Sequence, residues 1–173
     1  MKDGLKTKKI ALNGVLGALA VVCLLMADIL PTNKISLYAL SSFFVSVAII
    51  EGGIGSGWLF YLSTGLLSLI LVPDKVMVVP YILFFGIYGI VKFYIEKLER
   101  ISLEYILKFV YFNACAAIIL VGASALLDEM PVLKFPWYLL LAGAEIVFFI
   151  YDIVYTMFIN YYKNKIRSKL RLS

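Results

Sequence analysis

Six apolar stretches, most of them close to the length of a membrane crossing, constrain the fold of this chain more than any other feature. They run from about 10–30, 35–50, 54–72, 76–95, 103–127 and 135–161. An α-helix needs about 20 residues to cross the hydrocarbon core of a bilayer. A helix also satisfies its backbone hydrogen bonds internally, as lipid requires. The sequence therefore predicts an all-α integral membrane protein, a six-transmembrane-helix bundle forming a single domain over residues 1–173.

Composition also favours lipid over water as the surroundings of the chain. The chain is 63% hydrophobic and 16% charged, with a mean hydropathy of +0.98. A soluble domain is nearer half apolar and a quarter charged. The first stretch is too long for the apolar region of a cleaved signal peptide, so we expect it to remain as a helix. The second stretch is short, and we expect it to be tilted, partly irregular or sheltered by its neighbours.

Lysine and arginine are distributed unevenly around the predicted helices. Six crossings place both termini on one side, and that side holds thirteen of the sixteen basic residues. The other side holds Lys34, Lys75 and Lys134. Because positive residues are retained in the cytoplasm, both termini are predicted to be cytoplasmic. We expect the basic tail, KNKIRSKLR, to lie along anionic lipid headgroups, and the net charge of +5 does not indicate a nucleic-acid partner.

The stretch EGGIGSGW separates the second apolar stretch from the third. The spacing of Gly52 and Gly57 matches a phosphate-binding loop, but Trp58 and Leu59 stand where lysine and serine or threonine should follow. Glycine permits the positive φ of a tight turn and the close approach of two backbones. We therefore interpret the run as a hairpin corner between two helices, with Glu51 placed to cap the start of the third helix.

The sequence contains no pattern typical of a catalytic, metal or nucleotide site. Histidine is absent, which removes the usual general base and the commonest metal ligand. Cys23 and Cys115 lie inside apolar stretches without metal-binding spacing, so we interpret them as small buried hydrophobic residues. The sequence thus favours a protein that is not an enzyme and carries no cofactor.

Two acidic residues inside the last apolar stretch are the most informative polar groups. Glu145 and Asp152 are seven residues apart, so they share one helical face, about 10 Å apart along the axis. An acid at the bilayer centre costs about 2.5–3.5 kcal/mol on insertion scales, so both should face the bundle interior or a wet cavity. A ligand site and a structural network are equally favoured for Glu145. A structural network is favoured for Asp152, satisfied by Asn113 or by pairing with Lys92.

A second set of polar and aromatic residues gathers at the predicted outer end. Lys34 and Tyr38 follow the first outer connection, Tyr81 follows the second, and Trp137 lies at the third. Lids over an outward-facing cavity and ordinary anchors at the membrane interface both account for such residues.

The first apolar stretch carries IALNGVLGALAVV after the basic KTKK. A basic start followed by a face of small residues resembles the first helix of the S components of energy-coupling-factor transporters. Those S components are the substrate-binding membrane subunits of vitamin uptake systems, and their small-residue face docks on a transmembrane coupling subunit. The short second stretch, the glycine corner and GLLSLILVPDKVMVVPYILFFGIYGI also look similar in layout. The positions that match the docking face are Ala11, Gly14, Gly17 and Ala18.

The resemblance implies a multi-pass subunit of a bacterial cell membrane without an ATPase of its own. It would bind a vitamin-like small molecule between its outer loops and the outer halves of helices four to six. A coupling subunit and cytoplasmic ATPases would drive release. A carboxylate such as Glu145 would suit a ligand with an amine or a ring N–H. The substrate-binding residues predicted in this way are Glu145, Trp137, Tyr81, Lys34, Tyr38 and Asn113.

Two alternatives from other classes stay open at the level of sequence. The small six-helix membrane subunit of the bacterial rod-shape complex has a similar length and layout, and it is a structural scaffold with no ligand cavity. A stand-alone proton-coupled carrier would instead use Glu145 and Asp152 as a relay.

Overall fold

The computed structural model describes residues 2–30, 32–126 and 137–167, with side chains described from 7 to 30, 32 to 122 and 139 to 167. In this part of the chain six helices are long and apolar enough to cross a membrane. The prediction of an all-helical, multi-pass membrane protein is thereby confirmed. The helices are α1 (Lys2–Ile29), α2 (Lys34–Gly52), α3 (Ile54–Leu71), α4 (Gly86–Glu96), α5 (Ile101–Leu126) and α6 (Trp137–Tyr161).

Short helical turns of other types extend two of these helices. A 3₁₀ turn (Lys75–Val78) and a π-helical turn (Tyr81–Phe85) precede α4 and complete one span of 22 residues, from Lys75 to Glu96. A second π-helical turn (Tyr162–Ile166) continues α6. The predicted ranges match α2, α3, α5 and the span from Lys75 to Glu96 within two residues, whereas α1 begins at Lys2, eight residues before the predicted start. The predicted start of the sixth stretch, at residue 135, lies outside the described residues.

The corner between α2 and α3 consists of one residue, Gly53, whose φ is +80°. A side chain is strained at such a φ, which accounts for glycine there. A Cβ on Gly57 would collide with the side chain of Ile49, so the backbone of α3 lies directly against this α2 side chain just beyond the turn. The predicted hairpin corner is confirmed.

The predicted capping role of Glu51 is wrong. The residue preceding α3 is Gly53, and no side chain caps the helix. Glu51 lies in the last turn of α2, where its side chain is fully buried and an oxygen lies 3.4 Å from Nε of Arg167. Neither carboxylate oxygen of Glu51 has a hydrogen-bond partner among the described residues, so Glu51 makes no bond to the free N–H groups at the start of α3. The hairpin turns without it because Gly53 alone reverses the chain.

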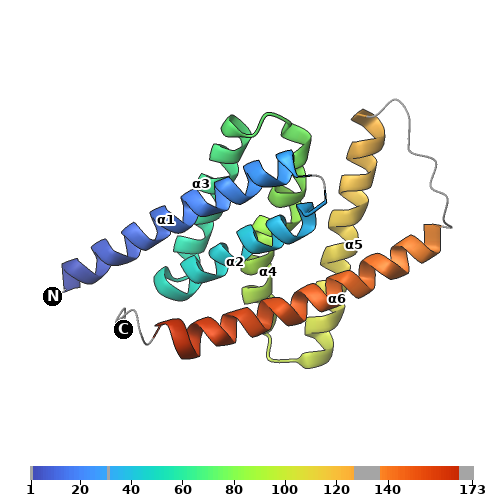
Figure 1. Cartoon of the computed structure of the whole chain (residues 1–173). Helices are drawn as coiled ribbons and strands as arrows, with labels where there is room; N and C mark the ends of the chain where they lie inside the picture. Colours follow the sequence, from blue (N-terminus) through green and yellow to red (C-terminus); the bar gives the residue numbers. More distant parts are fainter. Residues whose placement is uncertain (1, 31, 127–136, 168–173) are drawn as a thin grey trace.

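Contacts near the chain ends bring both of them to one end of the bundle. Lys9 donates a hydrogen bond of 2.7 Å to the backbone oxygen of Glu51, and Arg167 lies against the same residue. At the opposite end, the hydroxyl of Tyr38 donates to the backbone oxygen of Met77 at 2.6 Å. The starts of α1 and α3 and the ends of α2 and α6 therefore share one end (Figure 1).

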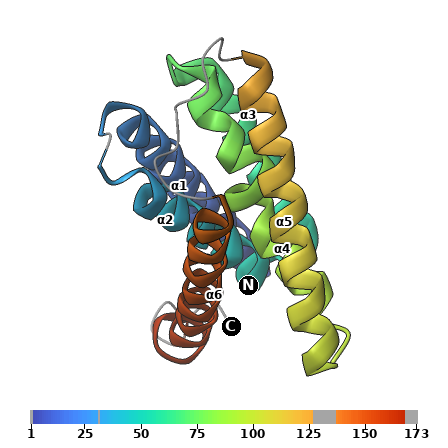
Figure 2. The same ribbon diagram turned by 90° about the vertical axis from the view of Figure 1, so that its right-hand side faces the viewer.

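The bundle has a compact side and an open side. Within the membrane-spanning window of each helix, half of the residues of α2 are buried, compared with 11% in α5 and 17% in α6. The short second stretch is therefore the most buried of the six spans. This confirms one of the three expectations for it, that its neighbours shelter it. Figures 1 and 2 show α1 to α4 packed together, whereas α5 and α6 diverge from each other toward the ends that lead into residues 127–136.

Candidate functional site

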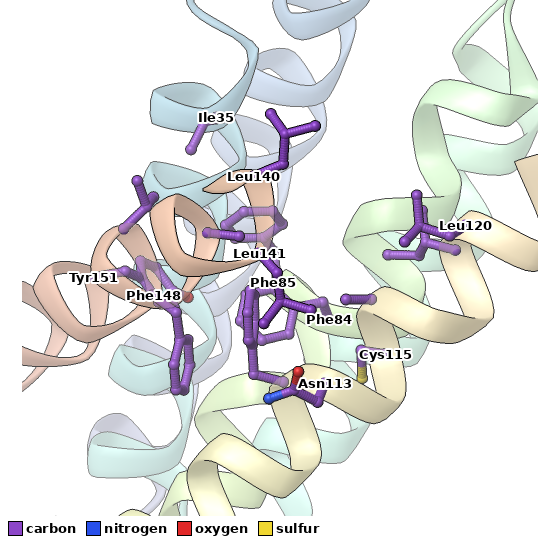
Figure 3. A pocket seen from close by; sticks show the side chains of 15 residues that line it. Ile35, Phe84, Phe85, Asn113, Cys115, Leu120, Leu140, Leu141, Phe148 and Tyr151 are labelled. Carbon is purple, nitrogen blue, oxygen red and sulfur yellow. The ribbon is translucent and has the colours of Figure 1, made fainter. Parts of the chain in front are cut away.

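A cavity of about 610 Å³ lies where α5 and α6 diverge (Figure 3). The π-helical turn before α4 forms its inner wall, and Ile35 at the start of α2 closes one side. Leu120 and Leu141, on its rim, are 66% and 50% exposed, so the cavity opens along the face between α5 and α6. Its lining is almost entirely apolar. The remaining lining residues are Phe84, Phe85, Phe112, Asn113, Cys115, Ala116, Ile119, Leu140, Ala144, Val147, Phe148 and Tyr151.

Stacked aromatic rings form the inner surface of this cavity. Phe112 of α5 and Phe148 of α6 stack with ring centroids 4.6 Å apart and planes 9° apart. Phe84 meets both rings edge-on, at 5.7 and 5.9 Å. The hydroxyl of Tyr151 lies 2.8 Å from that of Ser42 on α2, which ties the surface to the compact side of the bundle. Interlocked rings of this kind hold a fixed shape.

The π-helical turn explains how two consecutive phenylalanines reach the cavity. Phe84 and Phe85 both line it, although neighbours in an α-helix point about 100° apart. A π-turn widens the helix locally, and such turns are frequent at functional sites. The turn begins directly after Pro80, which has no N–H to donate. Tyr38 stacks on Phe85 at 5.4 Å and supports it from α2.

Asn113 is the amide side chain in the cavity wall, and it binds Glu145 on the facing helix. Its Nδ2 donates to Oε1 of Glu145 at 2.6 Å and to the backbone oxygen of Phe109 at 2.9 Å. Both amide hydrogens are engaged, so the group that Asn113 offers to the cavity is its carbonyl oxygen. The second carboxylate oxygen of Glu145, Oε2, is buried without a hydrogen-bond partner in the described part of the chain.

Asp152, two turns further along α6, has a different environment. Its Oδ1 accepts hydrogen bonds from Lys92 and, at 2.6 Å, from the hydroxyl of Tyr88, while Lys108 donates to Oδ2 at 3.1 Å. Lys92 also donates to Thr156 at 2.9 Å, and its side chain is 1% exposed. Both oxygens of this acid are therefore fully engaged within the bundle.

Glu96 at the end of α4 completes the charge balance of this network. It pairs with Lys92 at 2.8 Å and with Lys108 at 2.9 Å, so two ammonium groups face two carboxylates. A second cavity of about 310 Å³ reaches Lys108 and Asp152 from the end that holds the chain termini. We name Lys92, Lys108, Asp152, Glu96 and Tyr88 the charged network.

One layer of side chains separates the two cavities. Tyr151 lines the larger one and Asp152, the next residue, lines the smaller one. On α5, Phe112 lines the larger cavity, and Lys108, one helical turn earlier, lines the smaller one. Tyr88 packs edge-on against Phe148 at 5.9 Å within this layer. The structure therefore places an apolar chamber and a polar one on opposite sides of a thin aromatic and charged partition.

Of the six substrate-binding residues predicted from the sequence, Asn113 lines the large cavity, and Glu145 is bonded to it without lining the cavity itself. Lys34, Tyr38 and Tyr81 do not line it. Lys34 contacts the sulfur of Met77 at 3.3 Å, beside the Tyr38 hydroxyl bond described above. Tyr81 is fully buried, and its hydroxyl lies 2.7 Å from that of Thr64. Trp137 begins α6, and its side chain lies outside the described residues.

The two structural residues and the four small residues predicted from the sequence also have clear positions. Asp152 pairs with Lys92, one of the two partners expected for it; the other, Asn113, bonds Glu145 instead. On α1, the outward-facing positions are exposed, and a Cβ on Gly14 would meet nothing within 4 Å. Gly17 instead faces α3, where a Cβ would lie 3.7 Å from Thr64. The outward-facing positions are Ala11, Gly14 and Ala18.

Sequence reasoning missed the aromatic lining and Lys108. Phe84 and Tyr88 are four residues apart, as are Tyr151 and Tyr155, so aromatic stripes at helical spacing were present as a signal. Such stripes usually indicate ordinary packing, which is why they did not stand out. Lys108 was counted only as a basic residue near a helix end, yet it is 5% exposed.

No group of three or more His, Cys, Asp or Glu side chains in the described ranges is placed to hold a metal ion. The two cysteines are free and buried. Comparison of the chain with protein-family models, with curated protein sequences and with solved structures gives no match.

Proposed function

We propose that this chain is the substrate-binding membrane subunit of an uptake transporter of the energy-coupling-factor type, without an ATPase of its own. The observation that carries the proposal is the cavity between α5 and α6, which lies among the helices where the resemblance puts the ligand. Its volume of about 610 Å³ lies within the usual range of about 300–1,000 Å³ for small-molecule sites. A vitamin-like small molecule is the proposed ligand.

The outer face of α1 supports the proposed coupling partner. Ala11, Gly14 and Ala18 leave an exposed surface on which another helix could approach closely. In this proposal the surface docks on a transmembrane coupling subunit, and cytoplasmic ATPases supply the energy. In this proposal both termini, and the smaller cavity with them, face the cytoplasm of a bacterial cell, and the bias of basic residues supports that orientation.

Native mass spectrometry of the purified protein in lipid nanodiscs tests ligand binding. Ala144 lines the cavity, whereas Ala142 is exposed on the same helix and does not line it. We expect wild type and Ala142→Phe to retain a small molecule that Ala144→Phe loses. If no variant retains one and solutes from a growth medium fail to bind, the ligand-binding role is overturned and the scaffold alternative gains.

Substitution of Gly14 tests the coupling partner separately. We expect Gly14→Leu to fold normally but to abolish co-purification with a co-expressed coupling subunit. Gly122→Leu on α5 is a matched control, since a Cβ at Gly122 also meets nothing within 4 Å. Equal co-purification of both variants would contradict docking through α1.

A stand-alone carrier is the second candidate, and the smaller cavity favours it. That cavity reaches Asp152 from the opposite end, so the two cavities together approach the partition from both sides. A carrier would transport without other subunits, with Glu145 and Asp152 as its relay. Uptake of a retained ligand into proteoliposomes that contain this chain alone, driven by a proton gradient, would replace the first proposal by the second.

A further inference from the structure

We propose that the cavity between α5 and α6 takes an apolar, ring-sized molecule that carries one protonated amine, with the ammonium group at the carbonyl oxygen of Asn113 and the carboxylate of Glu145, bonded to the same amide, supplying the negative charge behind it. This inference rests on the proposed ligand-binding role and names the chemical class of the ligand. Three features support it: an acid without a cationic partner, a hydrogen-bond acceptor in the cavity wall, and the aromatic rings around that acceptor.

The charge of Glu145 is the first observation. Its Oε1 accepts a hydrogen bond from the neutral amide of Asn113, and its Oε2 is buried without a hydrogen-bond partner among the described residues. An acid within a membrane span is expensive unless it is paired, and a carboxylate accepts hydrogen bonds at both oxygens. Asp152, on the same helical face, meets two ammonium groups. Glu145 therefore lacks the cationic partner that Asp152 has.

The hydrogen-bonding character of the site is the second observation. The amide of Asn113 donates both of its N–H groups, one to Phe109 and one to Glu145, so its carbonyl oxygen is the group left to face the cavity. Asn113 thus offers the cavity an acceptor, and the charged carboxylate of Glu145 lies directly behind its amide. A ligand must supply an N–H or O–H donor to that acceptor. An anionic ligand would meet only acceptors and would be repelled.

The walls determine the rest of the ligand. Phe84, Phe112 and Phe148 present stacked and edge-on rings over the inner surface, and the rim is aliphatic (Figure 3). Aromatic faces attract an adjacent cation as well as apolar rings. The hydroxyl of Tyr151 is engaged with Ser42 and does not add a free donor. An apolar body with one cationic group matches this distribution.

Three naphthalene probes with the same ring system and different polar groups test the inference: 1-naphthylmethylamine, 1-naphthylmethanol and 1-naphthoate. Binding is measured by probe fluorescence in nanodiscs that contain the full chain. Ala144→Phe nanodiscs supply the background from lipid. We expect the amine to bind at least tenfold more tightly than the alcohol, and the naphthoate to show no specific binding.

Glu145→Gln is the decisive variant. Glutamine keeps an oxygen to accept the hydrogen bond from Asn113, so the cavity wall is preserved while the charge is lost. We expect the tenfold preference for the amine over the alcohol to fall to about one in Glu145→Gln, with alcohol binding unchanged. Glu145→Asp, which restores a carboxylate, should recover part of the preference.

The outcomes separate this inference from the proposed function. If amine and alcohol bind equally and Ala144→Phe blocks both, the cavity binds ligands but the amine class is wrong. A preference that survives in Glu145→Gln also overturns the class. If no probe binds above the Ala144→Phe background, and native mass spectrometry finds no retained molecule, both the class and the ligand-binding role fail.

Discussion

Glu145 and Asp152 lie on the same face of α6, yet their surroundings differ in almost every respect. Asp152 is bonded by Lys92, Lys108 and Tyr88, and both of its oxygens are occupied. Glu145 is bonded by Asn113 through one oxygen, and the other is buried without a hydrogen-bond partner among the described residues. Asp152 therefore joins three helices with both oxygens bonded, whereas Glu145 joins α6 to α5 through one oxygen and leaves the other without a partner.

The difference follows from where α5 and α6 lie relative to the compact side of the bundle. Near Asp152, α4 packs against both helices and supplies Lys92 and Tyr88. Gly89 allows this approach, because a Cβ there would collide with the hydroxyl of Tyr155. Near Glu145, α5 and α6 diverge, and Gly143 meets nothing within 4 Å. Close packing completes the charged network, and its absence leaves one oxygen of Glu145 without a hydrogen-bond partner among the described residues.

The largest expected effect comes from removing Asp152. Asp152→Ala leaves two buried ammonium groups with Glu96 as their remaining acidic partner. Breaking a buried ion pair in this way should lower the free energy of unfolding by about 3–5 kcal/mol. Thermal unfolding in detergent measures the loss. A variant as stable as wild type would show that the charged network does not hold α6 in place. Asp152 would then have no structural role to compare with Glu145.

Tyr88→Phe removes one hydrogen bond from Asp152 and keeps the ring. A hydrogen bond to a charged group contributes about 1.5–3 kcal/mol, so the free energy of unfolding should fall by that amount. Tyr94→Phe is the matched control, since Tyr94 is 51% exposed on the same helix and should be nearly neutral. Equal effects of the two variants in the same unfolding assay would contradict the role given to Tyr88.

A pair of glycine substitutions compares the closed and the open ends of α6 directly. Gly89→Ala forces the Tyr155 hydroxyl away from α4, and overpacking of this kind costs about 1–3 kcal/mol. Gly143→Ala meets open space and should be neutral or stabilising, by up to about 1 kcal/mol, through helix propensity. The difference in unfolding midpoint between the two variants is the measurement. A comparable loss in both would mean that the α6 surface near Glu145 is packed after all.

The smallest effect on stability is expected for Glu145→Gln. The hydrogen bond from Asn113 is kept, so the change in the free energy of unfolding should stay below about 1 kcal/mol. The same variant should lose amine selectivity, so stability and binding separate at this residue. A stability loss as large as that of Asp152→Ala would place Glu145 in the structural class and remove it from the ligand site.

Much of the architecture was predictable because lipid restricts the possible structures. Helix lengths and the reversal at Gly53 follow from apolar patterning and from the backbone freedom of glycine. The shared face of Glu145 and Asp152 follows from helical periodicity. These features depend on residues near each other in the sequence, and sequence reasoning is strongest there.

The details of the site depend on contacts between distant residues, which periodicity does not specify. Asn113 was a candidate partner of Asp152, but it bonds Glu145, and Lys92 and Lys108 pair with Asp152. Tyr81 was a reasonable ligand contact by depth, but the rotation of the π-helical turn directs it to Thr64 and directs Phe84 and Phe85 to the cavity. Glu51 was expected at a helix start and is buried beside Arg167 instead.

Labelling with N,N′-dicyclohexylcarbodiimide, an apolar reagent that couples to carboxyl groups, tests the contrast between the two acids most directly. The extent of modification is read by peptide mass spectrometry on protein in nanodiscs. We expect Glu145 to be modified at least tenfold more than Asp152, with Ala144→Phe suppressing the reaction and Ala142→Phe leaving it unchanged. Equal modification of both acids, or none at Glu145, would contradict an incompletely bonded acid on the same helix face as a fully bonded one.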